Sequence, residues 1–168
     1  MDNNNAPKEY PVKRIGGYLH RIVPILDNTG KVVSYALKPL MVELHIRDIM
    51  QIIVGSIILA IPVGFTEEVW VLSETLPTKN LFFIALFSVF FISVFVYHNF
   101  YKDHTNGFGL EFIKRIFAIY FISGVMVALF LTLIDQCPWG INNMLALKKI
   151  IIVTLPASMS ATLSDMIK

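Results

Sequence analysis

Acidic side chains near the ends of long apolar runs are the residues of this chain best placed to bind or steer a cation. Glu67 and Glu68 end the first such run, and Asp135 follows the third. Glu68 comes one helical turn after Gly64, so a carboxylate there would face protein or trapped water rather than lipid. We therefore predict that Glu68, with Glu67 and Asp135, lines the outer part of a proton or cation pathway.

Each of these acids also has a simpler interpretation. Glu68 lies two residues before Trp70, and an aromatic ring of this kind is typical of the headgroup level of a membrane. An acid at that level is ordinary, so both interpretations of Glu68 stay open. Asp135 and Asp165 lie at the ends of apolar runs, and a position at the membrane boundary explains them without a functional role.

Groups that could bind a metal or carry out catalysis are sparse. His98, Asp103 and His104 are the nearest approach to a metal site, but a site needs three or four converging ligands, and a solvated turn explains them better. The single cysteine, Cys137, has no second cysteine or histidine pair at a ligand spacing. The chain has no metalloprotease histidine pair, phosphate-binding glycine loop or serine elbow. We therefore expect neither enzymatic activity nor a metal or cofactor.

The composition indicates that these residues are positioned by membrane-spanning helices. Apolar residues make up 55% of the chain and charged residues 15%, with a mean hydropathy of +0.65, whereas soluble domains carry about 25% charge. Charges are frequent in residues 1–48 and then cluster in short islands. We predict a cytosolic segment over residues 1–48 and an all-α transmembrane domain over residues 49–168. Its four spans are predicted at residues 49–70, 81–100, 116–134 and 150–167.

Small residues spaced four apart predict where these spans contact one another. Such residues form a narrow helix face along which a second backbone can approach closely. The predicted contact residues are Ser56, Ala60 and Gly64 in the first span, Gly124 and Ala128 in the third, and Ala157 and Ala161 in the fourth. Because three spans carry such faces, we predict that the protein forms a homo-oligomer.

The distribution of lysine and arginine predicts the orientation in the membrane. Eleven of these residues fall on the side of the two termini and three on the other side, so both termini should face the cytoplasm. Trp70 and Trp139 both fall on the sparse outer side, which agrees with that orientation. The net charge of +2 gives no reason to expect nucleic acid as a partner.

The segment before the first span favours β structure. Two apolar, β-prone runs, residues 22–26 and 31–37, flank a turn sequence that ends in Gly30, which predicts a β-hairpin. A third extended piece is predicted at residues 40–44, leading into the membrane. Because an isolated hairpin is marginally stable, we expect it to pack on the membrane domain, on other subunits or on a cytosolic partner.

Several stretches resemble an uncharacterised prokaryotic family of integral membrane proteins, a domain of unknown function. They are PLMVELHIRDIMQ running into ILAIPVGFTEEVW, then LIDQCPWG, and the ending LPASMSATLSDMIK. The resemblance covers nearly the whole chain, including VPILDNTGKVVSY of the hairpin. It implies a prokaryotic inner-membrane location and transfers no catalytic residue.

Two functions remain open at this point. The first is an oligomeric pore or pathway for a cation or proton, favoured by the small-residue faces and the outer acids. The second is a membrane scaffold or partner-binding subunit without transport or catalytic activity, in which the acids only orient helices. Membrane lipid is an expected partner in both cases.

Overall fold

The computed structural model describes residues 11–15, 18–27, 31–39, 43–101 and 109–167. Within them, four helices are long and apolar enough to cross a membrane: Ile46–Gly64, Thr78–Tyr101, Gly109–Leu133 and Asn143–Met166. The predicted class, four membrane-spanning helices with a small β segment at the N-terminus, is confirmed. The chain divides into two compact units, Met1–Glu43 and Leu44–Lys168, which are described separately.

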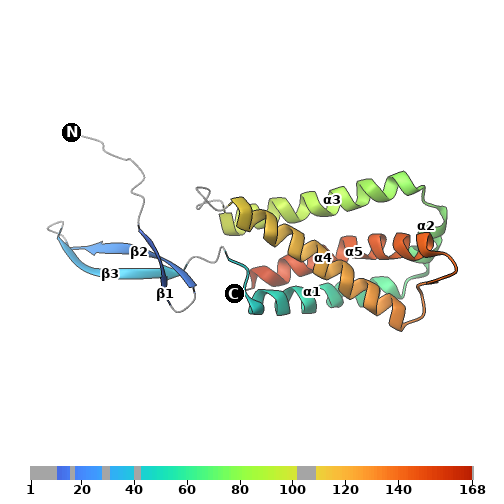
Figure 1. Cartoon of the computed structure of the whole chain (residues 1–168), viewed down its shortest axis with the longest axis horizontal. Helices are drawn as coiled ribbons and strands as arrows, with labels where there is room; N and C mark the ends of the chain where they lie inside the picture. The colour runs from blue at the N-terminus through green and yellow to red at the C-terminus, as the bar shows by residue number, and fades with distance from the viewer. Residues whose placement is uncertain (1–10, 16–17, 28–30, 40–42, 102–108, 168) are drawn as a thin grey trace. The chain divides into compact units, whose positions relative to one another are not determined.

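The helical unit is built around α5 (Asn143–Met166), which packs against α1 (Ile46–Gly64), α2 (Glu67–Thr75), α3 (Thr78–Val96) and α4 (Gly109–Leu133) (Figure 1). Half of the residues in the most apolar 18-residue stretch of α5 are buried, whereas the corresponding share for the span that contains α3 is 22%. A helix buried on several sides needs its polar groups satisfied internally. The hydroxyls of Thr154, Ser158 and Thr162 meet this need by donating to carbonyls one turn earlier in α5.

The first span ends earlier than predicted, and this changes the place of Glu68. Pro62 has no backbone N–H, and the N–H groups of Phe65 and Thr66 bond back to Pro62 and Val63. Thr66 is extended, and α2 begins at Glu67. The prediction that Glu68 lies one helical turn after Gly64 on the same helix was therefore wrong, because a second helix carries Glu68.

The third span follows a short π-helical end of the second. The π-helix η1 (Tyr97–Tyr101) directly continues α3, and Tyr101 is buried against the helical unit. A π-helical turn places its side chains out of the α-helical phase. Phe100 and Tyr101 are thereby brought next to Arg115 of α4.

The N-terminal unit contains a three-stranded antiparallel sheet in the order β1 (Val12–Ile15), β2 (Tyr18–Leu26) and β3 (Val32–Pro39). The hairpin of β2 and β3 is present, with a register shift at Ile25 and Leu26. The predicted third extended piece falls partly outside the described residues, and Glu43 and Leu44 are not in a strand. The third strand is β1 instead, because it can pair with the free edge of β2.

Candidate functional site

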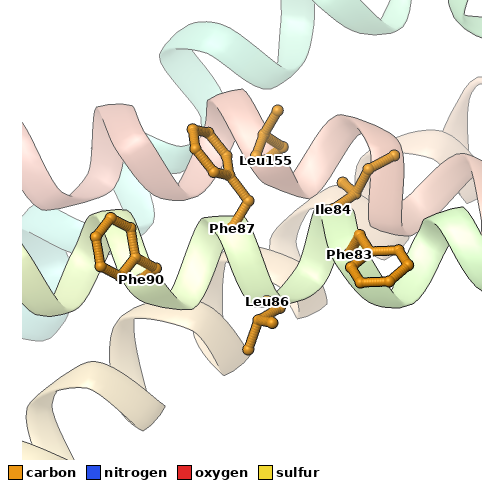
Figure 2. Close-up of a pocket in the computed structure, with 6 residues that line it drawn as sticks. All are labelled: Phe83, Ile84, Leu86, Phe87, Phe90 and Leu155. Atoms are coloured by element: carbon orange, nitrogen blue, oxygen red, sulfur yellow. The ribbon is translucent and has the colours of Figure 1, made fainter.

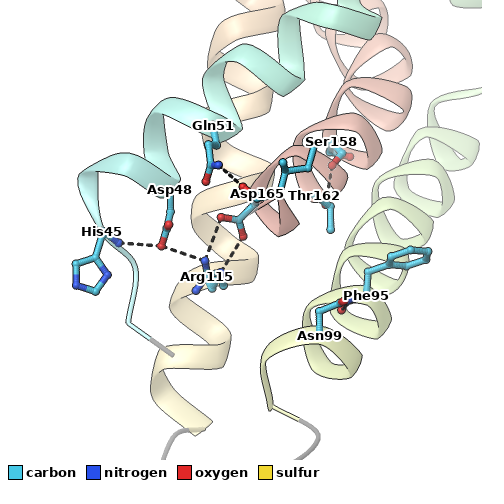
Figure 3. A network of polar contacts seen from close by, with 10 residues as sticks. His45, Asp48, Gln51, Phe95, Asn99, Arg115, Ser158, Thr162 and Asp165 are labelled. Atoms are coloured by element: carbon cyan, nitrogen blue, oxygen red, sulfur yellow. Dashed lines mark hydrogen bonds and ion pairs between the residues drawn. The ribbon is translucent and has the colours of Figure 1, made fainter. Parts of the chain in front are cut away.

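Three ionisable side chains from three helices meet at the end of the helical unit where α1 begins and α5 ends (Figure 3). Arg115 of α4 donates to Asp165 of α5 through Nε to Oδ2 at 2.9 Å and Nη2 to Oδ1 at 3.0 Å. The same Nη2 donates to Oδ2 of Asp48, in α1, at 3.1 Å. We call these three residues the ionic cluster. Their exposed fractions are 0% for Arg115 and Asp165 and 1% for Asp48.

The two acids of the ionic cluster occupy opposite ends of their helices. Asp48 lies in the first turn of α1, where its Oδ2 also accepts a hydrogen bond from the backbone N–H of His45 at 3.2 Å. The positive end of the helix dipole favours a carboxylate there. Asp165 lies in the last turn of α5, where the dipole disfavours a negative charge. Asp165 therefore depends more heavily on Arg115.

Arg115 faces the interior because of its helical phase. It shares one face of α4 with the other buried residues of that helix, Ile119, Ser123, Val127 and Leu131. Its guanidinium carbon lies 3.9 Å from the centroid of the Phe100 ring, a cation–π geometry. The preceding residue, Lys114, points outward and pairs with Glu111 at 2.8 Å.

The ionic cluster carries unequal charge when all its members are ionised. Two carboxylates share one guanidinium in a site that the protein shields from water. Burying charged groups is costly unless hydrogen bonds, a counter-ion or a proton balance them. One turn further along α1, Gln51 donates from Nε2 to the Ile167 carbonyl at 2.5 Å, while its buried Oε1 has no partner among the described residues.

The predicted pathway acids lie at the other end of the spans and face outward. Glu67 and Glu68 are exposed on α2 beside an open hollow of about 370 Å³. Asp135 is exposed in the turn after α4, with a positive φ of 58°. Within the described part of the chain, no three acids, histidines or cysteines gather as metal ligands would. The role of Glu68, Glu67 and Asp135 in a pathway stays a prediction.

The remaining candidate ligands are separated from one another. His98 is exposed in η1, while Asp103 and His104 lie outside the described residues. Cys137 is 6% exposed, and this burial raises the pKa of its thiol, an effect that Thr132 and Lys149 partly offset.

Small residues allow close contacts, with some differences from the predicted faces. Ser56, Ala60 and Gly64 are buried in α1, as are Ala157 and Ala161 in α5. Gly124 and Ala128 are only half-buried, because the buried face of α4 lies one position earlier. That position holds Ser123, whose hydroxyl lies 2.9 Å from that of Ser56.

Gly55 marks a close approach of α1 to α5 that the four-residue spacing of small residues did not predict. A Cβ atom there would lie 2.5 Å from Cβ of Ser164 and 2.9 Å from Cα of Ala161. The second atom belongs to backbone and cannot move independently of α5. Only glycine therefore fits at this position without displacing a helix.

Two lysines near the Glu68 end serve as caps for other segments. Lys148 donates to the carbonyl of Leu76, which ends α2, at 2.7 Å, and Lys149 donates to that of Gln136, beyond α4, at 3.0 Å. Carbonyls at helix C-termini favour cationic partners. Lys149 also lies 4.8 Å from the centroid of the Trp70 ring.

An apolar groove runs along the outer side of α3 beside α5 (Figure 2). It measures about 660 Å³, and its lining residues are Phe83, Ile84, Leu86, Phe87, Phe90 and Leu155. This lining offers side-chain carbon only, so the groove suits a lipid chain or an apolar helix and provides no ligand for an ion.

The ionic cluster was not predicted as a site, although one signal for it exists. Arg115 was counted as a topology charge, Asp48 as a domain boundary and Asp165 as a boundary acid. The signal is the spacing of buried residues along α4, which recur about every four positions. Arg115, eight residues before Ser123, falls on this buried face, whereas the adjacent Lys114 does not. That phase distinguishes an inward cation from an outward one.

The comparisons with known proteins place the chain in one family. No curated protein and no solved structure matches it. The family model described as "Putative integral membrane protein (DUF2391)" matches residues 28–167, which include the whole ionic cluster and all four spans. The chain therefore belongs to this family of integral membrane proteins.

Proposed function

We propose that the protein provides a proton or cation pathway across the membrane and that the ionic cluster is its ion-handling centre. The observation that carries the proposal is an ionic cluster inside the spans: Asp48 and Asp165 share the guanidinium of Arg115 at almost complete burial. Ionisable residues inside membrane spans are costly to keep and commonly mark ion pathways and proton relays.

Asp48 is the member of the ionic cluster suited to take up the proton. It receives one bond from Arg115, at 3.1 Å, whereas Asp165 receives two, at 2.9 and 3.0 Å. A proton on Asp48 would convert its carboxylate to the acid and leave the three residues of the ionic cluster with no net charge. Among the described residues, Arg115 and His45 contact Asp48, and Asp165 shares the same guanidinium. Protonation would leave the Arg115–Asp165 pair intact and weaken the link between α1 and α4.

Several copies of the chain are needed to complete such a pathway. The spans of one copy pack around α5, and four helices enclose little space for ions. We propose a homo-oligomer in which Glu67, Glu68 and Asp135 concentrate cations at the outer mouth. Native mass spectrometry from mild detergent should show more than two copies, and monomer at all concentrations would contradict the assembly.

Flux through liposomes containing the purified protein tests the pathway. The parent protein should dissipate an imposed proton or cation gradient, and the rate should depend on pH. Asp48→Asn keeps the side-chain size, removes one carboxylate charge and leaves the Arg115–Asp165 pair, so flux should fall at least about tenfold, the effect of ~1.4 kcal/mol on a barrier. Glu111→Gln, in an exposed surface pair, is the matched control. Parent-like flux in Asp48→Asn would exclude the ionic cluster from the pathway.

The second candidate is a membrane scaffold or partner-binding subunit without transport activity. It is favoured by the hydrogen bonds of the ionic cluster, since both acids already have protein donors. Here the cluster only holds α1, α4 and α5 together. A parent protein that assembles normally yet carries no proton, Na⁺ or K⁺ flux at any pH would favour this function.

We also propose that both termini face the cytoplasm of a prokaryotic inner membrane. The ionic cluster joins the start of α1 to the end of α5, so these two helix ends share a side, and the lysine and arginine bias assigns that side to the cytoplasm. In a Cys137→Ser background, a cysteine at Thr78 should react with an impermeant thiol reagent in whole cells. A cysteine at Lys31 should not react, and its labelling would reverse the orientation.

A further inference from the structure

The N-terminal sheet exposes a broad apolar face. Directly paired residues of antiparallel strands place their side chains on the same side, and the pairs Ile22 with Leu37 and Leu26 with Val32 define one side of the sheet. We call this side the apolar sheet face; its large apolar residues are Ile15, Ile22, Leu26, Val32, Tyr35 and Leu37. Ile22 is half-buried, and the exposed fractions of the other five run from 39% to 65%.

The sheet has no core of its own to account for this face. None of the strand residues whose side chains the structure describes is buried. A contiguous exposed apolar surface of this kind marks a site of contact with a partner or a membrane. The sheet therefore needs an occupant on its apolar face to gain the stability that apolar burial supplies.

The charge around the apolar sheet face indicates the chemistry of that occupant. From Val12 to Pro39 the chain carries five lysines and arginines against one aspartate. Lys13 and His20 are paired on the same side of the sheet as Ile22, whereas the register places Arg14, Arg21 and Lys38 on the opposite side. A sheet that is apolar on one side and carries cations at its border and on its other side matches an anionic bilayer, whose acyl boundary takes the apolar side chains while its headgroups attract the cations.

The covalent connection keeps the sheet close to such a surface. Only six residues, 40–45, separate the end of β3 from the start of α1, and a fully extended chain of that length reaches about 20 Å. Since α1 is a membrane span, the lipid surface beside it is within reach of the tethered sheet. A soluble protein would have to be recruited and would have to displace that surface.

We propose that the apolar sheet face binds the anionic lipid surface next to the spans of its own chain. This binding is independent of transport, so it stands or falls separately from the proposed pathway. It presents Tyr35 to the lipid and leaves Ser34, on the opposite side, facing water.

Fluorescent probes on the two sides of the sheet test the proposal in the full chain. In a Cys137→Ser background, an environment-sensitive dye is attached to a single cysteine at position 35 or 34, and the protein is reconstituted in phosphatidylcholine nanodiscs with or without phosphatidylglycerol. With the anionic lipid, iodide quenching at position 35 should fall at least about fivefold, the effect of one basic residue near the surface. Quenching at position 34 should change little.

Charge variants complete the test. Replacing Lys13 and Lys31 with Gln removes two exposed cations of the sheet unit and should restore quenching at position 35. Lys79→Gln, at an exposed lysine in the first turn of α3, should have no effect. Equal quenching at both positions in both lipids would overturn the proposal. So would protection at position 35 that needs a higher protein-to-lipid ratio or an added soluble protein, because the occupant would then be a second copy or a protein partner.

Discussion

Acidic residues are buried at one end of the helical unit and exposed at the other. At the end where α1 begins, Asp48 and Asp165 are buried and bonded to Arg115. At the other end, Glu67 and Glu68 are exposed on α2, and the buried cation of that region, Lys149, bonds a backbone carbonyl. A carboxylate can be buried in a span only where a cation from another helix reaches it. Whether an acid is buried therefore depends less on its position within an apolar run than on whether a cation from another helix can reach it.

The largest expected effect comes from removing the shared cation. Arg115→Leu removes the guanidinium that two buried carboxylates share and should destabilise the protein by about 3–5 kcal/mol. The thermal unfolding midpoint in detergent measures this loss. Lys114→Leu is the matched control, since its exposed pair contributes at most about 1 kcal/mol. An unchanged unfolding midpoint for Arg115→Leu would show that the buried carboxylates do not depend on Arg115.

The next largest effect is expected at Gly55, where α1 packs closely against α5. The Cβ of Gly55→Ala would approach the backbone of α5 to 2.9 Å, so the helices must separate at a cost of about 1–3 kcal/mol. Gly124→Ala is the control: its nearest neighbour would be Thr154 Oγ1 at 3.9 Å. Alanine is also the better helix former by about 1 kcal/mol. Unfolding midpoints should fall for the first variant and hold or rise for the second; the reverse order would place the tight contact elsewhere.

A smaller effect concerns the thiol at the opposite end of the unit. Burial raises the pKa of Cys137, and only the thiolate reacts with a maleimide. At pH 8 its labelling should be slower than that of a cysteine at Ile141, which is 90% exposed, in a Cys137→Ser background. The labelling rate of Cys137 should keep rising with pH beyond the pH at which labelling of the exposed thiol levels off.

The same shift affects stability. Because the pKa of Cys137 is raised in the folded protein, the stabilisation from its neutral thiol is complete below a pH of about 8.5 and is lost at higher pH. Equal rates for the two thiols would contradict the shift.

The smallest effect on stability is expected at Glu68. Its side chain is exposed, so Glu68→Gln should change the unfolding free energy by no more than about 0.5 kcal/mol. If Glu68 lines the outer mouth, the same variant should still alter flux or its pH dependence, with Glu74→Gln as the control in α2. A Glu68→Gln protein that fails to assemble would show that this end also has a structural carboxylate.

Much of the fold could be predicted because it depends on local patterns. The four spans follow from apolar runs long enough for a bilayer, and the β2–β3 hairpin follows from two β-prone runs around a turn. Errors occurred where local signals compete: Pro62 and Thr66 separate α2 from α1, although the first span was predicted to continue to Trp70. The strand β1 was missed because four residues with two charges carry a weak β signal.

The sequence by itself determined the membrane class, the number of spans and the charge asymmetry between their two sides, since each depends on the solvation of individual segments. Only the tertiary structure decided which charges are functional candidates. Arg115 lies 50 residues from Asp165 and 67 from Asp48, and no spacing rule links residues so far apart. Their meeting depends on how α1, α4 and α5 pack, and that packing also decides that Glu68 faces outward while Asp165 faces the interior.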